Sequence, residues 1–297
     1  MIHVVMASDD NYIHHLAVAA MSCVDRTSED VTLHVLCNNV SEENKRKLTE
    51  SLQAVKANRK INFIDLDAKS LEGLCGERFI SVTMYARYFI PELIPDADRA
   101  LYLDTDILVR HDISDLWNTD ISDYYVAAVP DPFFAKYYAA IGIPEGTPVF
   151  NSGVLLMNLK KWRETGFGKK LLDYTLREKC IDQTALNHIL AGNWKQLDAK
   201  YNVLTGYYRS YYRFRRKKRV TLPENVKELV HNPHILHTNG KSKLPDYGYR
   251  YFFADEYKHY LDMTPWRDKK PTDKKFKGLL RKYHAKAVIK TIDFLRK

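Results

Sequence analysis

The first two-thirds of the chain alternates short apolar runs with segments in which apolar residues have helical spacing. Strands are expected at His3–Ala7, Val31–Leu36, Ile61–Ile64 and Ala100–Leu103. Helices are expected at Tyr12–Arg26 and from the N-cap residue Ser41 to about Val55. Strands that alternate with helices form crossover units, which build a mainly parallel, doubly wound sheet. The sequence therefore predicts an α/β fold that binds ligands beyond the carboxyl ends of its strands.

The net charge of +9 is confined to the end of the chain. Residues 267–297 hold twelve Lys or Arg and three Asp, whereas residues 1–266 hold 34 basic and 34 acidic groups. A neutral body argues against a protein that wraps nucleic acid over its whole surface. Pro265 and Pro271 flank the change in character. We therefore expect one domain over residues 1–265 and a basic tail over residues 266–297.

Apolar residues of the tail keep roughly helical spacing, from Phe276 and Leu280 to Ile292 and Leu295, with Lys and Arg on the other faces. This pattern predicts a basic amphipathic helix that lies on an anionic membrane surface. The alternative is a solvated charged tail, or a helix that packs on its own domain.

Other features of the sequence favour the cytoplasm. The longest uncharged run, Asn11–Val24, is 14 residues long, shorter than the roughly 20 apolar residues of a membrane span. The N-terminus carries acids where an export signal has bases. Four cysteines without CxxC spacing suit a reducing compartment, and we expect them to be buried. We therefore predict a cytoplasmic protein, peripheral at the inner face of the cell membrane through its tail.

The strongest local signal is the run Leu101–Leu108, in which Asp104 and Asp106 follow a buried strand. In an extended chain, two carboxylates at this spacing point to the same side. Such carboxylates are costly unless a cation neutralises them, and their hard oxygen atoms suit Mg²⁺ or Mn²⁺. Two alternatives stay open. The acids could be plain strand-end or helix-capping groups, or a phosphatase motif with Asp104 as nucleophile and Asp106 as general acid, although Leu108 stands where that motif has Thr or Val.

Five motifs occur in one order along residues 1–245. They are Ala7–Tyr12, Asp104–Asp106, Phe150–Asn158, Asp182-Gln183, and His237-x-x-Gly240-x-x-Lys243. Together they resemble family 8 of the retaining glycosyltransferases, the group of bacterial lipopolysaccharide galactosyl- and glucosyltransferases and of glycogenin. The resemblance implies a nucleotide-sugar-binding, Rossmann-like (GT-A) fold and Mn²⁺. It also implies transfer of a hexose, with retention, from UDP-galactose or UDP-glucose to a hydroxyl of a glycan, a lipid-linked glycan or a cell-surface acceptor.

The resemblance also implies which residues bind the donor. The family's uridine-binding strand end is matched by Ala7, Asp9 and Asn11, of which Asn11 would alternatively cap the following helix. A basic residue near the donor phosphates and sugar is matched by Arg87. The turn that touches the donor sugar is matched by Asn151, Ser152 and Gly153, for which the start of a strand is the alternative.

The metal ligands of the family are matched by Asp104 and Asp106, with Thr105 between them, and by His237. A His ligand favours Mn²⁺ over Mg²⁺, because imidazole is a softer donor than a carboxylate. The pyrophosphate contacts are matched by Gly240 and Lys243, where glycine admits the phosphate to backbone N–H groups and lysine adds a point charge. The sequence departs from the family at Leu244-Pro245, where the family often has Pro-Trp. This departure bears on how the C-terminal loop closes over the donor.

The candidate catalytic residues, matched to positions beside the anomeric carbon, are Asp131, Asp182 and Gln183. Asp182 alone would be interpreted as the N-cap of a helix over Gln183–Leu190. Because an amide is a poor nucleophile, we favour same-face attack by the acceptor hydroxyl, whose proton passes to the leaving phosphate. The alternative is a covalent glycosyl-enzyme intermediate on Asp131 or Asp182.

Residues 207–219 leave a non-enzymatic alternative open. They mix aromatic residues with seven bases and no acid, which is typical of base stacking and phosphate contacts in nucleic-acid-binding proteins. That interpretation leaves the acids at 9, 104 and 106 unexplained, so we expect no nucleic-acid partner.

Overall fold

A computed structural model of the 297-residue chain describes residues 1–56, 60–66, 82–134, 142–212, 222–239 and 253–269, together with residues 287, 290, 291 and 293. Its strands are β1 (Ile2–Asp9), β2 (Val31–Asn38), β3 (Lys60–Asp65), β4 (Arg99–Leu103), β5 (Ile107–Val109), β6 (Val126–Pro130), β7 (Phe150–Asn158), β8 (Lys195–Gln196), β9 (Val203–Leu204) and β10 (Ile235–His237). Its α-helices are α1 (Ile13–Arg26), α2 (Glu42–Val55), α3 (Ile90–Leu93), α4 (Ser114–Trp117), α5 (Leu159–Thr165), α6 (Phe167–Glu178), α7 (Asp182–Leu190), α8 (Thr205–Tyr211), α9 (Val226–His231) and α10 (Ala254–Asp262). Two 3₁₀ helices, η2 (Val82–Phe89) and η5 (Ala199–Tyr201), complete the described elements.

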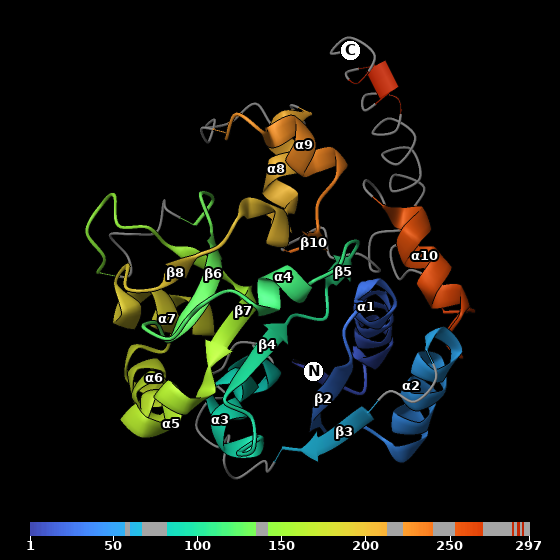
Figure 1. Ribbon diagram of the computed structural model, residues 1–297, viewed down its shortest axis with the longest axis horizontal. Helices are drawn as coiled ribbons and strands as arrows, with labels where there is room; N and C mark the ends of the chain where they lie inside the picture. The colour runs from blue at the N-terminus through green and yellow to red at the C-terminus, as the bar shows by residue number, and fades with distance from the viewer. Residues whose placement is uncertain are drawn as a thin grey trace.

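The centre of the molecule is a seven-stranded sheet with the strand order β3-β2-β1-β4-β7-β6-β8 (Figure 1). Strands β3, β2, β1 and β4 run parallel, β7 runs antiparallel to β4 and β6, and β8 runs parallel to β6. Helices flank this sheet, so the predicted α/β fold with a mainly parallel sheet is confirmed. A smaller sheet, in the order β5-β10-β9, lies beside it.

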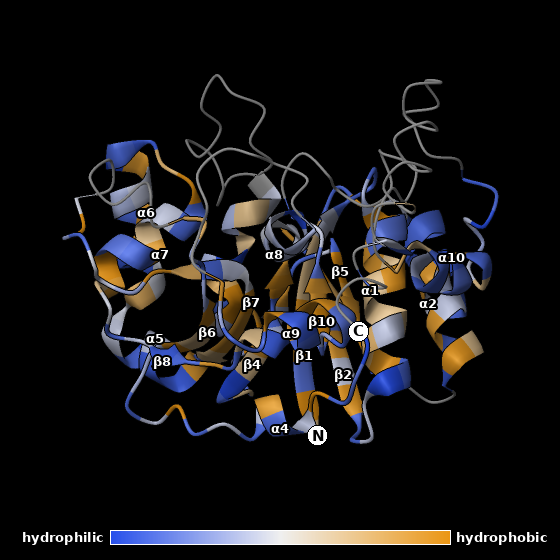
Figure 2. Ribbon diagram, turned by 90° about the horizontal axis from the view of Figure 1, so that it is seen from above, coloured by the Kyte–Doolittle hydropathy of each residue, from blue (hydrophilic) through white to orange (hydrophobic). Residues whose placement is uncertain are grey.

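The central strands are mostly apolar because both faces of the sheet are covered. Along β1, Val4 and Met6 belong to one hydrophobic cluster with α1, whereas Val5 and Ala7 belong to a second cluster with η2, α5, α6 and α7. Figure 2 shows the hydrophobic residues concentrated in the central strands and on the helix sides that face them. This double burial explains why the first strands are recognisable in the sequence as short apolar runs.

Helix α10 follows the family motifs in the sequence but packs into the same core. Tyr257 and Tyr260 are each 2% exposed, and the Tyr257 hydroxyl lies 2.7 Å from Nδ1 of His15 in α1. Arg110, just after β5, forms a two-point ion pair with Glu256 of α10, with distances of 2.9 Å from both Nε and Nη2. The helix therefore links α1 to the small sheet.

The start of the aromatic and basic segment 207–219 also belongs to the core. Its first four tyrosines, Tyr207, Tyr208, Tyr211 and Tyr212, are at most 4% exposed. Tyrosines buried in this way do not present their rings to nucleic-acid bases. Residues 213–219 lie outside the described residues.

Candidate active site

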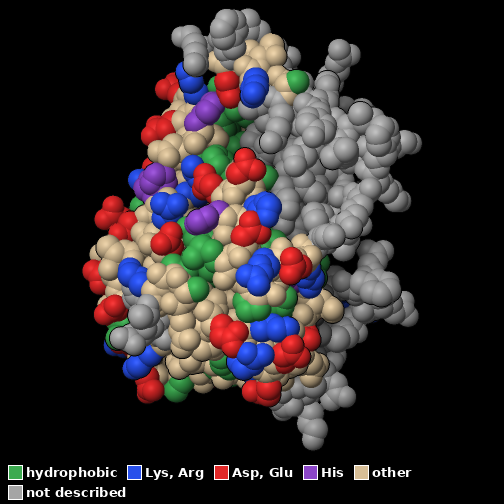
Figure 3. Space-filling view, turned by 90° about the vertical axis from the view of Figure 1, so that its right-hand side faces the viewer, with side chains coloured by type: hydrophobic (Ala, Val, Ile, Leu, Met, Phe, Trp, Pro, Cys, Tyr) green, Lys and Arg blue, Asp and Glu red, His purple; other side chains and the backbone are tan. Residues whose placement is uncertain are grey.

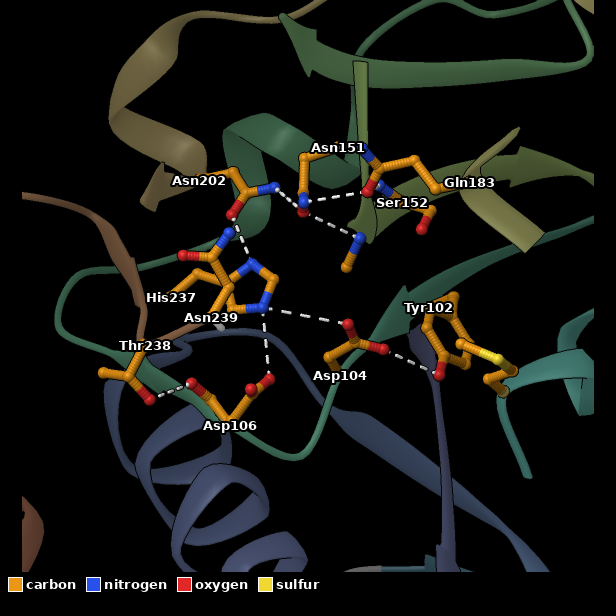
Figure 4. Close-up of polar contacts among 12 residues, drawn as sticks. Tyr102, Asp104, Asp106, Asn151, Ser152, Gln183, Asn202, His237, Thr238 and Asn239 are labelled. Atoms are coloured by element: carbon orange, nitrogen blue, oxygen red, sulfur yellow. Dashed lines mark hydrogen bonds and ion pairs between the residues drawn. The ribbon is translucent and has the colours of Figure 1, made fainter. Parts of the chain in front are cut away.

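Polar residues from separate parts of the chain meet at the edge of the sheet where the parallel strands end. Asp9 ends β1, and Asp104 follows β4. Because β7 runs antiparallel to β4, with Leu103 opposite Val154, the first residues of β7 lie at this edge as well. Its other members are Asp131 after β6, Asp182 and Gln183 at the start of α7, and His237 at the end of β10. Figure 4 shows Gln183 and His237 in this group.

Asp104, Asp106 and His237 form the candidate metal site at this edge. The imidazole Nε2 of His237 lies 3.1 Å from Oδ1 of Asp106 and 3.8 Å from Oδ2 of Asp104. We expected the two carboxylates to share a side of an extended chain, but Asp104–Asp106 is the turn between β4 and β5. Thr105, the middle residue of that turn, is partly exposed. The acids converge because the chain turns, and the antiparallel pairing of His237 with Ile107 brings the imidazole to them.

The three side chains fit a divalent cation. One ligand atom from each lies within 4.8 Å of the others, and among the described residues no other group of three His, Cys, Asp or Glu is so arranged. Adjacent ligands of an octahedral ion with bonds of about 2.1 Å are roughly 3 Å apart, close to the shorter of the two distances from His237. The side chains of Asp106 and His237 are 14% and 3% exposed, so a cation between them would offset the cost of burying charge.

Arg87 of η2 lies behind the metal site, 3% exposed. Its guanidinium is 3.0 Å from Oδ1 of Asp104 and 2.9 Å from Oδ2 of Asp182. It also donates to the carbonyl oxygen of Ser152 and to the hydroxyl of Tyr102. Arg87 thus connects a candidate metal ligand to a candidate catalytic residue; whether it also touches the donor stays a prediction.

Burial and mutual contacts determine the pKa values of Arg87 and Asp182. Burial disfavours the charged guanidinium, but the carboxylates of Asp182 and Asp104 and the hydroxyl of Tyr102 outweigh that effect and raise the pKa of Arg87. Burial likewise raises the pKa of Asp182, against the opposing influence of Arg87. The alternative role of Asp182 as an N-cap is wrong. Ile181 occupies the N-cap position, and the carboxylate of Asp182 faces Arg87 instead.

Asp131 and Gln183 lie beside each other next to β7. Oδ1 of Asp131 accepts the backbone N–H groups of Phe133 and Phe134, and Nε2 of Gln183 lies 3.5 Å from Oδ2 of Asp131. Burial raises the pKa of Asp131, while these donors act in the opposite direction. Asn151, Ser152 and Gly153, which we expected in a turn, are the second to fourth residues of β7, so the alternative of a strand start is confirmed.

The end of β1 is organised by two aspartates with different partners. Oδ1 of Asp9 accepts the N–H groups of Asn11 and Tyr12 in the turn before α1. Tyr12 occupies the N-cap position of α1, which makes the alternative cap role of Asn11 wrong. Oδ1 of Asp10 accepts hydrogen bonds from Ser41 and Asn44 at the start of α2. Ala7, two residues before the end of β1, is 7% exposed. Contacts of Ala7, Asp9 and Asn11 with a uridine stay predictions.

Two residues of the site were missed by the sequence analysis. The hydroxyl of Tyr102 donates to Oδ1 of Asp104 at 2.9 Å, and strand alternation, which puts residues 102 and 104 on one face, is the signal that would have found it. Asn202 contacts both His237 and Asn151, and no local pattern marks it. Gly240 and Lys243, the expected pyrophosphate contacts, lie outside the described residues.

Comparison with known proteins agrees with this geometry. The model of the family described as Glycosyl transferase family 8 matches residues 3–244. The chain is 31% identical over 279 residues to general stress protein A of Bacillus subtilis, covering 90% of this chain and 95% of that protein. It is 28% identical to a lipopolysaccharide 1,2-glucosyltransferase of Escherichia coli, covering 76% of this chain and 70% of that protein.

A solved structure is similar along almost its whole length. The galactosyltransferase LgtC, crystallised with donor and acceptor sugar analogues, superposes with a TM-score of 0.77 at 29% identity, covering 89% of this chain and 96% of LgtC. This similarity confirms the predicted GT-A fold for the body of the chain.

Proposed function

Since this chain belongs to glycosyl transferase family 8, we propose that it moves galactose or glucose from a UDP-sugar to a hydroxyl of a glycan, glycolipid or cell-surface acceptor. The observation that carries the proposal is the convergence of Asp104, Asp106 and His237 at the carboxyl edge of the sheet. Ligands of doubly wound folds bind at this edge. The family assignment favours transfer over the phosphatase alternative for the same carboxylates.

The metal site would serve the leaving group. A divalent cation, which we take to be Mn²⁺ because of the imidazole ligand, supplies fixed positive charge where the diphosphate becomes more negative. Asp104 is held in place for this role by Arg87 and Tyr102, each within 3.0 Å of its Oδ1. Lys243 and Gly240 are the further residues proposed for the diphosphate, and Asp9 for the uracil ring.

The contacts of the candidate catalytic residues support same-face attack by the acceptor. Oε1 of Gln183 already accepts hydrogen bonds from Asn151 and Ser152, Oδ1 of Asp131 accepts two backbone N–H groups, and Asp182 is paired with Arg87. Oxygens engaged in this way are weaker nucleophiles. We therefore propose that the acceptor hydroxyl attacks directly and that the leaving phosphate takes its proton. Trapping of a glycosylated Asp131 or Asp182 with a fluorinated donor would contradict this route.

The test is a panel of UDP-sugars incubated with the full chain and Mn²⁺, in which slow donor hydrolysis is measured as UDP release without knowledge of the acceptor. We expect UDP-galactose or UDP-glucose to react, and the activity to be lost in Asp104→Ala and Asp106→Ala. Asp98→Ala, at a carboxylate that is 80% exposed and paired with Arg163, is the control that should keep activity. Phosphate release from a simple phosphoester with Mg²⁺, without UDP release from any sugar nucleotide, would refute the proposal in favour of the phosphatase.

We also propose that the basic tail holds the protein at an anionic membrane surface, on the cytoplasmic side, near a lipid-linked acceptor. None of the helices among the described residues is long and apolar enough to cross a bilayer. On the face drawn in Figure 3, acidic and basic side chains of the described residues are interspersed. The excess of basic residues in the sequence lies in residues 267–297, which makes the tail the proposed source of attraction. Oδ1 of Asp293 accepts from the hydroxyl of Tyr212 and lies 3.0 Å from Nε2 of His231, which fixes this point of the tail against the domain.

Vesicle binding tests the membrane proposal. Sedimentation with vesicles that contain phosphatidylglycerol should retain the full chain at low salt, and less of a variant in which Lys274, Lys275, Lys277 and Lys282 are replaced by Gln, because each base near the headgroups contributes about 1 kcal/mol. Equal retention of both proteins would leave the tail as a solvated segment or one that packs on its own domain.

A further inference from the structure

A continuous line of buried side-chain amides joins the candidate catalytic residue Gln183 to the candidate metal ligand His237 (Figure 4). Gln183 contacts Asn151, Asn151 contacts Asn202, and Asn202 contacts His237. The four residues are 9%, 6%, 0% and 2% exposed in that order. Buried polar groups need hydrogen-bond partners, and each amide has one donor end and one acceptor end. The donor and acceptor in each hydrogen bond of the line therefore depend on the hydrogen bond before it.

The backbone of β7 fixes the direction at one end of the line. The N–H of Ser152 donates to Gln183 at 3.3 Å, and the N–H of Gly153 donates to Asn151 at 3.0 Å. A backbone N–H is only a donor, so each of these side chains must turn its carbonyl oxygen towards β7. The amide nitrogen of Asn151 is then the donor to Oε1 of Gln183, at 3.1 Å.

The donor and acceptor can be assigned in the same way for the hydrogen bonds from Asn151 to Asn202 and from Asn202 to His237. Oδ1 of Asn151 has a second acceptor position, which Nδ2 of Asn202 fills at 2.9 Å. The carbonyl oxygen of Asn202 is therefore the atom that faces Nδ1 of His237, also at 2.9 Å. An oxygen without a hydrogen can only accept, so the imidazole proton must be on Nδ1.

We propose that Asn202 is a positioning residue that holds His237 in the Nδ1–H tautomer and thereby presents the lone pair of Nε2 to a divalent cation shared with Asp104 and Asp106. Nε2 is the ring nitrogen that faces the two carboxylates, at 3.1 and 3.8 Å. The second nitrogen of a metal-binding imidazole is commonly held by a carbonyl or carboxylate oxygen, which fixes both tautomer and ring orientation. The role of the Asn202–His237 contact in catalysis rests on the proposed metal-dependent transfer, but the tautomer and the metal affinity can be measured without any transfer reaction.

The backbone keeps Asn202 and His237 in register. Asn202 directly precedes β9, and β9 runs parallel to β10 with Leu204 paired to His237. The backbone N–H of Asn202 donates to the carbonyl oxygen of Ala199 at 3.1 Å. A Cβ atom at Gly153 would lie 2.3 Å from Cε1 of His237. The imidazole is thus hydrogen-bonded to the Asn202 amide and packs closely on the bare backbone of Gly153.

The first experiment measures the tautomer directly. The full chain is labelled with ¹⁵N-histidine, and long-range ¹H–¹⁵N spectra are recorded without metal at a pH where the ring is neutral, with the signals of His237 identified by their loss in His237→Gln. We expect the Nδ1–H form in the wild type and in Asn202→Asp, whose carboxylate also accepts from Nδ1. The second oxygen of that carboxylate replaces the N–H that donates to Oδ1 of Asn151, so Asn202→Asp should lower thermal stability and still keep the tautomer. Asn202→Leu should show a mixture with the Nε2–H form.

The second experiment measures Mn²⁺ alone, by the electron paramagnetic resonance signal of the free ion. Loss of the partner that orients a metal-binding imidazole typically weakens affinity by 10–100-fold. We expect a loss of this size in Asn202→Leu and little or none in Asn202→Asp. A residue that only stabilised the fold would weaken the two variants alike, so this difference identifies a positioning role.

Asn158→Leu is the matched control, because Asn158 is a hydrogen-bonded amide at the opposite end of β7. It should lower thermal stability without changing Mn²⁺ affinity. A wild-type ring with its proton on Nε2, or equal Mn²⁺ affinity in the wild type and Asn202→Leu, would overturn the inference. Neither measurement uses a sugar nucleotide, so a negative UDP-sugar panel would remove the proposed function and leave this result standing.

Discussion

Replacement of Arg87 by Met should be among the most destabilising single changes in the described part of the chain. Arg87 is 3% exposed and is the cationic partner of Asp182, whose side chain is 4% exposed, and of Asp104, which is 27% exposed. Removal of one partner from a buried ion pair leaves an uncompensated charge and costs about 3–5 kcal/mol. The total stability of a domain is only about 5–15 kcal/mol, so about a fifth or more of it would be lost.

Urea unfolding followed by tryptophan fluorescence, in the absence of metal, measures this loss. With a slope of about 3 kcal/mol per molar urea, the midpoint should fall by roughly 1–1.7 M. The control is Arg177→Met, which removes an exposed ion pair to Glu178 and should leave the midpoint nearly unchanged.

A double-mutant cycle separates the ion pair from simple loss of packing. Asp182→Asn added to Arg87→Met removes the unpaired carboxylate and should restore at least about 1 kcal/mol relative to the sum of the single changes. A loss below about 1 kcal/mol in Arg87→Met, or a cycle that is additive within about 0.5 kcal/mol, would refute the reasoning.

Three further predictions follow from other contacts. Gly153→Ala places a Cβ atom 2.3 Å from Cε1 of His237, and the resulting displacement of about 1 Å should lower donor hydrolysis roughly 100-fold; unchanged hydrolysis would contradict the geometry. Burial, with help from Lys269, lowers the pKa of His14 to about 3, so below about pH 6.5 the unfolded chain binds a proton that the folded chain does not. Stability should therefore fall more steeply in the wild type than in His14→Gln as the pH drops from 6.5 towards 4, and parallel pH profiles would exclude this explanation. Ser41→Ala removes the side chain that accepts from the N–H of Asn44 and should cost about 1 kcal/mol in urea unfolding; an unchanged midpoint would show that the cap does not stabilise α2.

Local sequence patterns predicted the first strands and helices because those elements have simple environments. Strands β1 and β2 are buried almost throughout, residues 13–24 of α1 are all buried, and α2 buries one face, so apolar runs and apolar spacing identify these elements. Strand β7 was harder, because it begins with Asn151, Ser152 and Gly153, whose polar groups face the site. The small sheet was mostly missed, since its strands are two or three residues long.

In the candidate site, contacts between residues far apart in the sequence determine roles that local sequence patterns predict wrongly. Asp182 stands where a helix cap is expected, but Arg87, which is 95 residues earlier, takes its carboxylate. Asn11 has the right residue type for a cap, yet Tyr12 occupies the N-cap position, and the carboxylate of Asp9 accepts N–H groups in the turn before the helix. The motif order predicted the grouping of Asp104, Asp106 and His237, but nothing in the sequence indicates that Asn202 lies between His237 and Asn151.

The position of α10 has a practical consequence for anyone who expresses this protein in pieces. The family match ends at residue 244, whereas Tyr257, Tyr260 and Leu261 are among the residues that close the core over α1. A fragment trimmed to the match would expose the flank of α1, including His15, and would lose the Glu256 partner of Arg110, which directly follows β5. Such a fragment should aggregate through that bare apolar flank, whereas one that extends through α10 should remain monodisperse.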